Sequence, residues 1–224
     1  MIRAMYAILL DGGYLTKKLY ERLGRHPNAD DIVAECDRLR ALPIVAEYEL
    51  LRIYYYDAAP LAEQVRYPVS DNPYNLGDTE RFRRAQSLYD QLILKPNFAL
   101  RLGHVRISPH SWKMKPAKAK QLIRNHRPLQ DDDFLLDVSQ KGVDMRIGMD
   151  MARLALRDMV RAVVVVTGDS DFVPAFKFVR REGVRVILEP LTRNATLELR
   201  HHADVVLQPE PVAAPQPVAG LPAD

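Results

Sequence analysis

Three aspartates stand where the chain could assemble a site for divalent-metal chemistry. Asp11 directly follows the apolar run Ala-Ile-Leu-Leu and precedes two glycines, and Asp169 and Asp171 follow a run of valines. If the two runs are neighbouring parallel strands, their carboxyl ends meet at one edge of a sheet and bring the carboxylates together. Crowded carboxylates raise one another's pKa unless a cation neutralises them, and oxygen-only ligands favour Mg²⁺ or Mn²⁺.

A fourth aspartate, Asp144, follows Lys141-Gly142-Val143 at the expected start of a helix. Asp150 lies six residues further along, about 120° around the helix from Asp144, so we rank it below Asp144 as a ligand of the same ion. All four have a structural alternative: Asp169 or Asp171 as a helix N-cap, Asp11 as a turn residue, and Asp144 as a first-turn carboxylate. The occurrence of acids after two separate strands favours a metal site.

The elements that must position these residues alternate along the chain. Short apolar runs that end at polar or glycine-containing turns predict buried strands at residues 5–10, 51–56, 162–167 and 184–188, with a weak last strand at 204–207. Helical periodicity predicts helices at 29–47, 79–94, 144–159 and 172–182. This alternation predicts an α/β fold, a doubly wound and mostly parallel sheet with helices on both faces.

Domain boundaries follow from composition. Residues 1–207 form one expected domain, and the proline-rich segment 208–224 predicts a disordered tail. Residues 99–107 are compatible with a further strand, whereas 108–128 show no clean periodicity and predict an excursion or flexible loop, so that we expect a basic insertion at about 108–130.

The formal charge of +3 hides a strong segregation. Residues 95–130 hold nine Lys or Arg and no acid, so this segment carries +9 and the other residues carry −6. Such asymmetry often marks contact with a polyanion. We predict nucleic-acid contacts from Lys and Arg side chains together with stacking of an unpaired base on Trp112. The basic candidates are Lys113, Lys115, Lys118, Lys120, Arg124 and Arg127.

Two alternatives accompany the basic segment. It would otherwise be a solvated loop with Trp112 folded into the core, and the acidic run at 131–133 would be its internal counter-charge or an unbound turn. Six phosphate contacts would give a slope of log affinity against log salt of about −4 to −5 on a single strand.

Composition excludes several classes of protein. At 47% apolar and 27% charged residues the chain is neither a disordered polymer nor a fibre, and its single cysteine, Cys36, allows no internal disulfide and no multi-thiolate zinc site. No apolar run approaches the roughly 20 residues of a membrane span, and the first residues lack a signal-peptide pattern. We therefore expect a cytoplasmic protein without a membrane partner.

Three motifs in order resemble a known family. Leu10-Asp11-Gly12-Gly13-Tyr14-Leu15, Lys141-Gly142-Val143-Asp144 and Thr167-Gly168-Asp169-Ser170-Asp171-Phe172-Val173-Pro174 look like the NYN domain, of the LabA-like branch of the PIN-like nucleases. Tyr54-Tyr55-Tyr56-Asp57 is also similar to the family pattern. The resemblance covers about residues 5–207.

The resemblance implies a Rossmann-like (PIN-like) sheet and a ribonuclease that hydrolyses phosphodiester bonds in RNA with Mg²⁺ or Mn²⁺. The residues it assigns to catalysis and to the metal are Asp11, Asp144, Asp169 and Asp171. Lys141, Thr167 and Ser170 are candidate supporting residues for phosphate or a metal-bound water, although exposure of Lys141 and helix-start roles for the hydroxyls are the more usual uses. No nucleophilic side chain is needed, because metal-activated water suffices.

Other functions compete with this one. An RNA-binding or regulatory module with weak or no nuclease activity would use the same acidic pocket and basic segment. A phosphatase with an aspartate nucleophile would normally have a second Asp at position 13, where this chain has Gly. RNA is the expected partner, and assembly into a homo-oligomer stays open.

Overall fold

The structure, a computed structural model, describes residues 3–192 and 195–208. All but the first residue of the tail predicted at 208–224 lies outside these ranges. Within them the main sheet has seven strands in the order β6-β5-β2-β1-β7-β8-β9. The strands are β1 (Met5–Asp11), β2 (Glu49–Ala58), β5 (Phe98–Met114), β6 (Phe134–Lys141), β7 (Ala162–Val166), β8 (Arg185–Glu189) and β9 (Val205–Val206).

The predicted α/β class and mostly parallel sheet are confirmed. β1 pairs in parallel with β2 on one side and β7 on the other, and β2–β5, β7–β8 and β8–β9 are also parallel pairs. Each of the five predicted strands has a counterpart in this sheet. β6 is the exception to the direction, because it runs antiparallel to β5.

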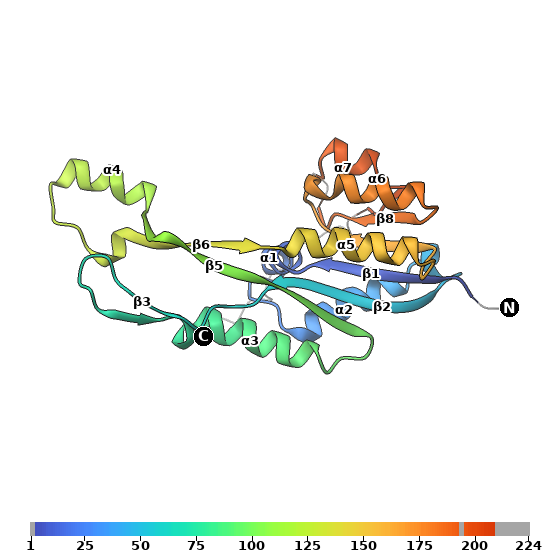
Figure 1. Cartoon of the computed structure of the whole chain (residues 1–224), viewed down its shortest axis with the longest axis horizontal. Coiled ribbons are helices and arrows are strands. Elements are labelled where there is room, and N and C mark those ends of the chain that lie inside the picture. Colours follow the sequence, from blue (N-terminus) through green and yellow to red (C-terminus); the bar gives the residue numbers. More distant parts are fainter. Residues whose placement is uncertain (1–2, 193–194, 209–224) are drawn as a thin grey trace, which may run out of the picture.

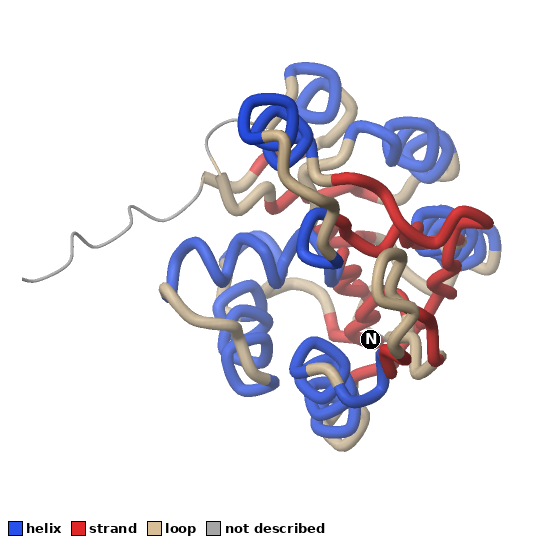
Figure 2. Tube along the Cα trace, turned by 90° about the vertical axis from the view of Figure 1, so that its left-hand side faces the viewer, coloured by secondary structure: helices blue, strands red, loops and turns tan. Residues whose placement is uncertain are grey.

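Helices cover both faces of the sheet and form two hydrophobic cores (Figures 1 and 2). One face packs against α1 (Gly12–Leu23), α2 (Ala29–Arg40) and α3 (Glu80–Leu92), and the other against α5 (Val143–Leu156), α6 (Val173–Arg181) and α7 (Leu197–His201). The four valines of β7, Val163 to Val166, are almost fully buried between the two layers. Strands covered on both faces explain why these runs do not alternate with polar residues. No helix in the described ranges combines the length and apolar character that crossing a membrane would need.

The predicted helices are confirmed with shorter bounds. The segment predicted at 29–47 is α2, which ends at Arg40 and is followed by a short 3₁₀ turn at Pro43–Val45. α2 begins with a capping box between Asn28 and Asp31, in which two otherwise unpaired backbone N–H groups at the helix start are satisfied. α1 was not among the predicted helices, because it follows β1 without a loop.

Residues 108–128, predicted to be an excursion or a flexible loop, form an excursion built of regular elements, so the loop alternative is wrong. β5 continues to Met114 and is followed by α4 (Pro116–Asn125), and β6 then returns beside β5. We call residues 104–141 the arm, which projects beyond the sheet in Figure 1 with α4 at its tip. In β5 the exposed His104 and Arg106 alternate with the half-buried Val105 and Ile107, as expected for a two-stranded ribbon.

A glycine marks the start of the arm. Up to Gly103 β5 pairs with β2, and from His104 onward it pairs with β6. A Cβ atom at Gly103 would lie 2.7 Å from the carbonyl oxygen of Lys141, so the close approach of β6 requires glycine at this position.

A small hairpin supports the arm. β3 (Gln64–Arg66) and β4 (Pro73–Asn75) pair antiparallel, and the turn between them contacts the arm. The carboxylate of Asp131 accepts hydrogen bonds from the backbone N–H groups of Val69 and Ser70, at 3.0 and 3.2 Å. The arm is therefore attached to the domain along one side.

Candidate functional site

Asp11 is the last residue of β1 and caps the helix that follows. Its Oδ1 accepts a hydrogen bond from the backbone N–H of Tyr14 at 3.1 Å, as an N-cap residue does. The strand turns directly into α1 at Gly12, where a Cβ atom would lie 2.6 Å from both the Tyr55 ring and the Tyr56 carbonyl oxygen. Glycine therefore permits the sharp turn that leaves the second oxygen of Asp11 free for another partner.

That partner is Thr167, at the end of the neighbouring strand β7. The buried Thr167 hydroxyl donates to Oδ2 of Asp11 at 3.1 Å and accepts a hydrogen bond from the backbone N–H of Asp169, also at 3.1 Å. Asp169 in turn accepts from the backbone N–H of Asp171 at 2.9 Å. The strand ends predicted to be neighbours are neighbours, and one hydroxyl joins them. Because Thr167 donates its only proton to Asp11, it is a structural bridge in this state.

Tyr14 and Gly168 fix the loop after β7. A Cβ atom at Gly168 would lie 2.4 Å from the ring of Tyr14, so the ring packs directly on the backbone of this loop. The hydroxyl of Tyr14 donates to the carbonyl oxygen of Pro190, just beyond β8. Burial, with help from Glu189 and Asp11, raises the pKa of Tyr14 to about 12, which keeps the phenol a donor. Sequence reasoning gave Tyr14 no role, and only its place after Asp-Gly-Gly would have indicated one.

Asp144 lies in the first turn of α5. The helix begins directly after Gly142, which is in the left-handed region at φ 78°. Partial burial raises the pKa of Asp144, and the charges of Asp169 and Asp171 raise it further. Burial likewise raises the pKa of Asp11, with additional repulsion from Asp144 and Asp169. The four aspartates singled out from the sequence are therefore close enough to interact electrostatically. Among the described residues none of the four has an ion-pair partner.

The aspartates do not form a ready-made metal cage. Over residues 3–192 and 195–208, no three His, Cys, Asp or Glu side chains are grouped closely enough to hold a metal ion. Donor chemistry nevertheless suits a hard divalent cation, because carboxylate oxygens are present and competing thiolates are not. A bound ion would require these carboxylates to come closer together.

The remaining candidates at this edge are less involved. Lys141 is exposed at the end of β6, and Ser170 is half-buried at the start of the 3₁₀ turn Ser170–Phe172. Asp150 accepts hydrogen bonds from the Tyr56 hydroxyl at 3.0 Å and from Nε of Arg101 at 3.1 Å. Asp150 thus belongs to a separate polar contact, consistent with its lower rank.

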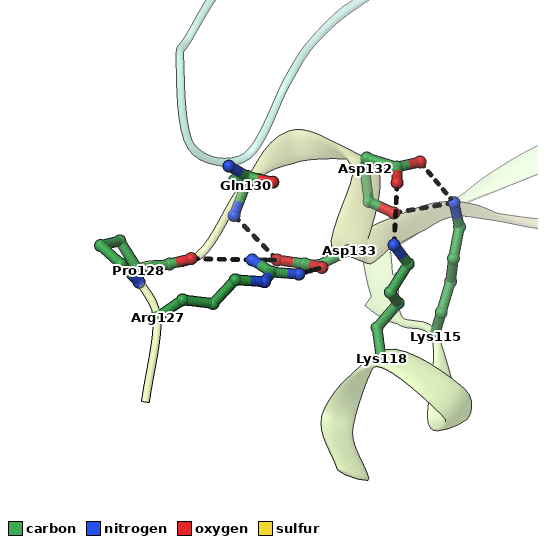
Figure 3. A network of polar contacts seen from close by, with 7 residues as sticks. All are labelled: Lys115, Lys118, Arg127, Pro128, Gln130, Asp132 and Asp133. Atoms are coloured by element: carbon green, nitrogen blue, oxygen red, sulfur yellow. Dashed lines mark hydrogen bonds and ion pairs between the residues drawn. The ribbon is translucent and has the colours of Figure 1, made fainter. Parts of the chain in front are cut away.

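Most of the basic side chains predicted to contact nucleic acid already have acidic partners (Figure 3). Lys115 and Lys118 both pair with Asp132 at 3.1 Å, and Arg127 donates to both oxygens of Asp133. Hydrogen bonding by Arg127 holds the pKa of Asp133 at about 2. The acidic run at 131–133 is therefore the internal counter-charge of the segment.

The other three basic candidates differ in whether an acidic side chain already pairs with them. Lys113 pairs with Asp137 at 2.8 Å. Lys120 and Arg124, both exposed on α4, have no ion-pair partner within the described part of the chain. The surface available to a polyanion is thus smaller than the charge count suggested, and it is concentrated on α4.

Trp112 is already stacked on another aromatic ring of the protein. Its ring is stacked on Tyr67 with centroids 5.4 Å apart, and its Nε1–H donates to the carbonyl oxygen of Arg66 at 2.8 Å. Trp112 therefore joins the arm to the β3–β4 hairpin. The residue lies in a small aromatic cluster outside the two main cores, so the predicted core position is wrong, whereas stacking on an unpaired base stays a prediction.

Asp57 is an acid at a strand end that received no role from the sequence. It occupies the carboxyl-end region of β2, but its side chain points to the α3 face, opposite to that of Asp11. Its oxygens accept hydrogen bonds from the backbone N–H of Ala58 at 2.7 Å and from the Tyr55 hydroxyl at 3.3 Å. The strand-end rule that selected Asp11 also selects Asp57.

The mostly parallel sheet, with interacting carboxylates at the carboxyl ends of β1 and β7, defines a Rossmann-like protein of the PIN-like class. Residues 105–208 match the model of the NYN domain. This match identifies an NYN domain in residues 105–208. The match contains the motifs around Asp144 and Asp169 and most of the arm, and it begins after Asp11. Membership of the LabA-like branch stays a prediction.

No curated protein sequence matches the chain. A crystal structure of a protein of unknown function from Vibrio parahaemolyticus is similar at 17% sequence identity and a TM-score of 0.49, over 92% of this chain and 94% of that one.

The raised pKa of Asp11 predicts a pH dependence of stability. In the folded, metal-free protein Asp11 keeps its proton to a higher pH than in the unfolded chain, so its contribution to stability is present at low pH and is lost as the pH rises through the folded pKa. In urea unfolding with EDTA from about pH 4 to pH 7, we expect Asp11→Asn to lose less stability than the parent. Equal losses in the two proteins would contradict the assignment.

Proposed function

We propose that the chain is a divalent-metal-dependent ribonuclease whose site lies where β1, β7 and the start of α5 meet. The observation that carries the proposal is the Thr167 bridge, which ties Asp11 to the loop of Asp169 and Asp171. Asp144 adds a fourth interacting carboxylate, and the four have no basic partner in the described structure. The match of residues 105–208 to the NYN domain supports a nuclease of the PIN-like class.

Each residue has a definite part in this proposal. Asp11, Asp144, Asp169 and Asp171 would hold Mg²⁺ or Mn²⁺, which would lower the pKa of a bound water and neutralise charge on the attacked phosphate. Thr167 orients Asp11 through its donated hydrogen bond, and Tyr14 holds the loop after β7 in place. Exposure of Lys141 beside this edge makes it available to a phosphate of the substrate.

A second function has an observation in its favour. Since no three acidic side chains in the described ranges are grouped for metal, an RNA-binding or regulatory module that does not cut is the alternative. Such a module would bind RNA through the same surfaces with no requirement for Mg²⁺ or Mn²⁺.

The experiment that separates the two functions is cleavage of a labelled RNA by metal-stripped protein. The nuclease should be inactive after chelation and should recover when Mg²⁺ or Mn²⁺ is restored. Calorimetry should show Mn²⁺ binding to the parent that is weakened in Asp169→Asn. Binding of RNA without cleavage at any Mg²⁺ or Mn²⁺ concentration would overturn the nuclease in favour of the module.

Salt dependence measures the contribution of α4 to RNA binding. Each phosphate contact contributes about 0.7 to the slope of log affinity against log salt on a single strand. We expect the double variant Lys120→Ala/Arg124→Ala to flatten this slope by about 1.4, measured by fluorescence anisotropy in EDTA. The matched control, Lys177→Ala/Arg181→Ala, alters two exposed residues of α6. An unchanged slope in the α4 variant would exclude this helix from the interface.

A further inference from the structure

A groove of about 700 Å³ lies on the face of the sheet opposite to Asp144. One wall is α3, another is the apolar side of the arm with Val105, Leu136 and Val138, and Gly13 and Thr16 of α1 close one end. Gly13 follows Asp11 by two positions, so the groove opens beside the candidate catalytic edge. A strand of RNA whose phosphate lies at Asp11 would therefore have a neighbouring nucleotide at the groove.

Asp57 lies in this groove as a carboxylate without a compensating cation. The backbone N–H of Ala58 and the hydroxyl of Tyr55 each donate to a different oxygen of Asp57. No ion pair involves Asp57 in the part of the chain that the structure describes. Burial raises the pKa of Asp57, and hydrogen bonds from Ala58, Tyr89 and Tyr55 together with the charge of Arg81 offset part of this rise. An ionised carboxylate has about four acceptor positions, so these donors leave room for further donors from a ligand.

The other groups that line the groove indicate what kind of ligand would supply donors to Asp57. Arg81 lines the groove, is exposed, and has no ion-pair partner among the described residues, whereas the nearby Arg84 pairs with Glu80. Phe82 and Leu88 add apolar surface to the lining of the same groove. An acceptor, an apolar wall and a cation at the rim complement a planar base that carries N–H groups and is attached to a phosphate.

Base chemistry narrows the choice further. An ionised carboxylate offers two parallel acceptors. Guanine presents two adjacent donors to them, N1–H and the exocyclic amine. Adenine and cytosine present one amine beside a ring-nitrogen acceptor, and uracil presents one N–H between two carbonyls. Each of these would turn an acceptor toward the carboxylate, which disfavours it.

We propose that this groove binds a guanine base of the RNA next to the cleaved bond, with Asp57 as the specificity-determining residue and Arg81 as the contact to its phosphate. The proposal rests on the proposed function for its place in the RNA strand. The base recognition itself is independent of cleavage.

The direct test measures the binding of free nucleotides in EDTA, either by calorimetry or by NMR of the protein. Guanosine monophosphate should bind at least about tenfold more tightly than the adenosine, cytidine and uridine monophosphates. Inosine monophosphate, which lacks the exocyclic amine, should fall between. Asp57→Asn replaces one acceptor by a donor and should abolish the preference, while its remaining oxygen can still accept from Ala58. Asp90→Asn, on the exposed side of α3, should leave the preference intact.

A second variant keeps the test decisive if Asp57→Asn does not fold. Arg81→Ala should weaken the binding of all four nucleotides by a similar factor. Arg83 is exposed on α3 but lies outside the groove lining, so Arg83→Ala should leave binding unchanged. Equal affinity of the parent for all four nucleotides would overturn the proposal, as would a guanine preference that survives in folded Asp57→Asn.

Cleavage of RNAs that differ at a single base distinguishes the two proposals. A guanine preference in binding without metal-dependent cleavage would remove the nuclease and leave the groove assignment standing. Metal-dependent cleavage with no base preference and no nucleotide binding in the groove would remove the groove assignment alone.

Discussion

Asp11→Asn is expected to lower the rate of RNA cleavage by at least about 100-fold while the fold is retained. The substitution removes the charge that a divalent cation would bind, at the residue where the ends of β1 and β7 are joined. Asparagine is as good an N-cap as aspartate, so the hydrogen bond from the Tyr14 N–H can persist. The measurement is single-turnover cleavage at saturating Mg²⁺, with circular dichroism and the unfolding midpoint as checks on the fold.

The matched control is Asp37→Asn, which neutralises an exposed carboxylate of α2 whose ion-pair partner is Arg40. This variant should cleave at the parental rate. If Asp11→Asn also cleaved at that rate, Asp11 would be a structural cap and the site assignment would be wrong.

The central sheet was predictable because its signal is local. The valine run of β7 and the apolar run of β1 each end at a motif that breaks the strand, and burial on both faces needs no knowledge of the partner. The convergence of Asp11 and Asp169 followed from one further assumption, that the strands are adjacent, which the β1–β7 pairing confirms.

The arm was not predictable in the same way. Its β5 strand is rich in polar and basic residues, and its partner β6 comes after an intervening helix. Pairing of this kind depends on contacts between distant residues, which a periodicity over a short window does not contain. The charges were countable in the sequence, but their partners were not, and the pairing of Lys115 and Lys118 with Asp132 reduced the free positive charge.

Asp57 shows that prediction from the sequence is limited where the direction of a side chain decides its role. Successive residues of a strand point to opposite faces, so an acid at a strand end belongs to one face or the other. Tyr54 and Tyr56 lie in the core on the α5 side and Tyr55 in the core on the α3 side, which places Asp57 on the α3 side. The strand register and the helices packed on each face distinguish Asp57 from Asp11, and the sequence pattern alone does not.

Arg38→Met is expected to lower the free energy of unfolding by about 3–5 kcal/mol. Arg38, on α2, donates to both Glu35 and Glu189, whose side chains are 2% and 0% exposed. Arg22 would still pair with Glu35 at 2.8 Å, whereas Glu189 would lose its cation and keep the hydrogen bond from the Leu191 backbone N–H. Methionine preserves the apolar part of the side chain. The loss in the free energy of unfolding therefore measures the cost of leaving the buried Glu189 carboxylate without a cation. Urea unfolding at neutral pH measures it.

Two companion variants identify the cause of that loss. Arg40→Met breaks the exposed pair with Asp37 and should cost less than about 1 kcal/mol. Adding Glu189→Gln to Arg38→Met removes the stranded charge and should recover part of the stability. An Arg38→Met loss as small as that of Arg40→Met would show that water reaches Glu189. Because Glu189 directly precedes Pro190, whose carbonyl oxygen accepts the hydrogen bond from Tyr14, an intact network at the end of β8 also supports the loop that carries Asp169.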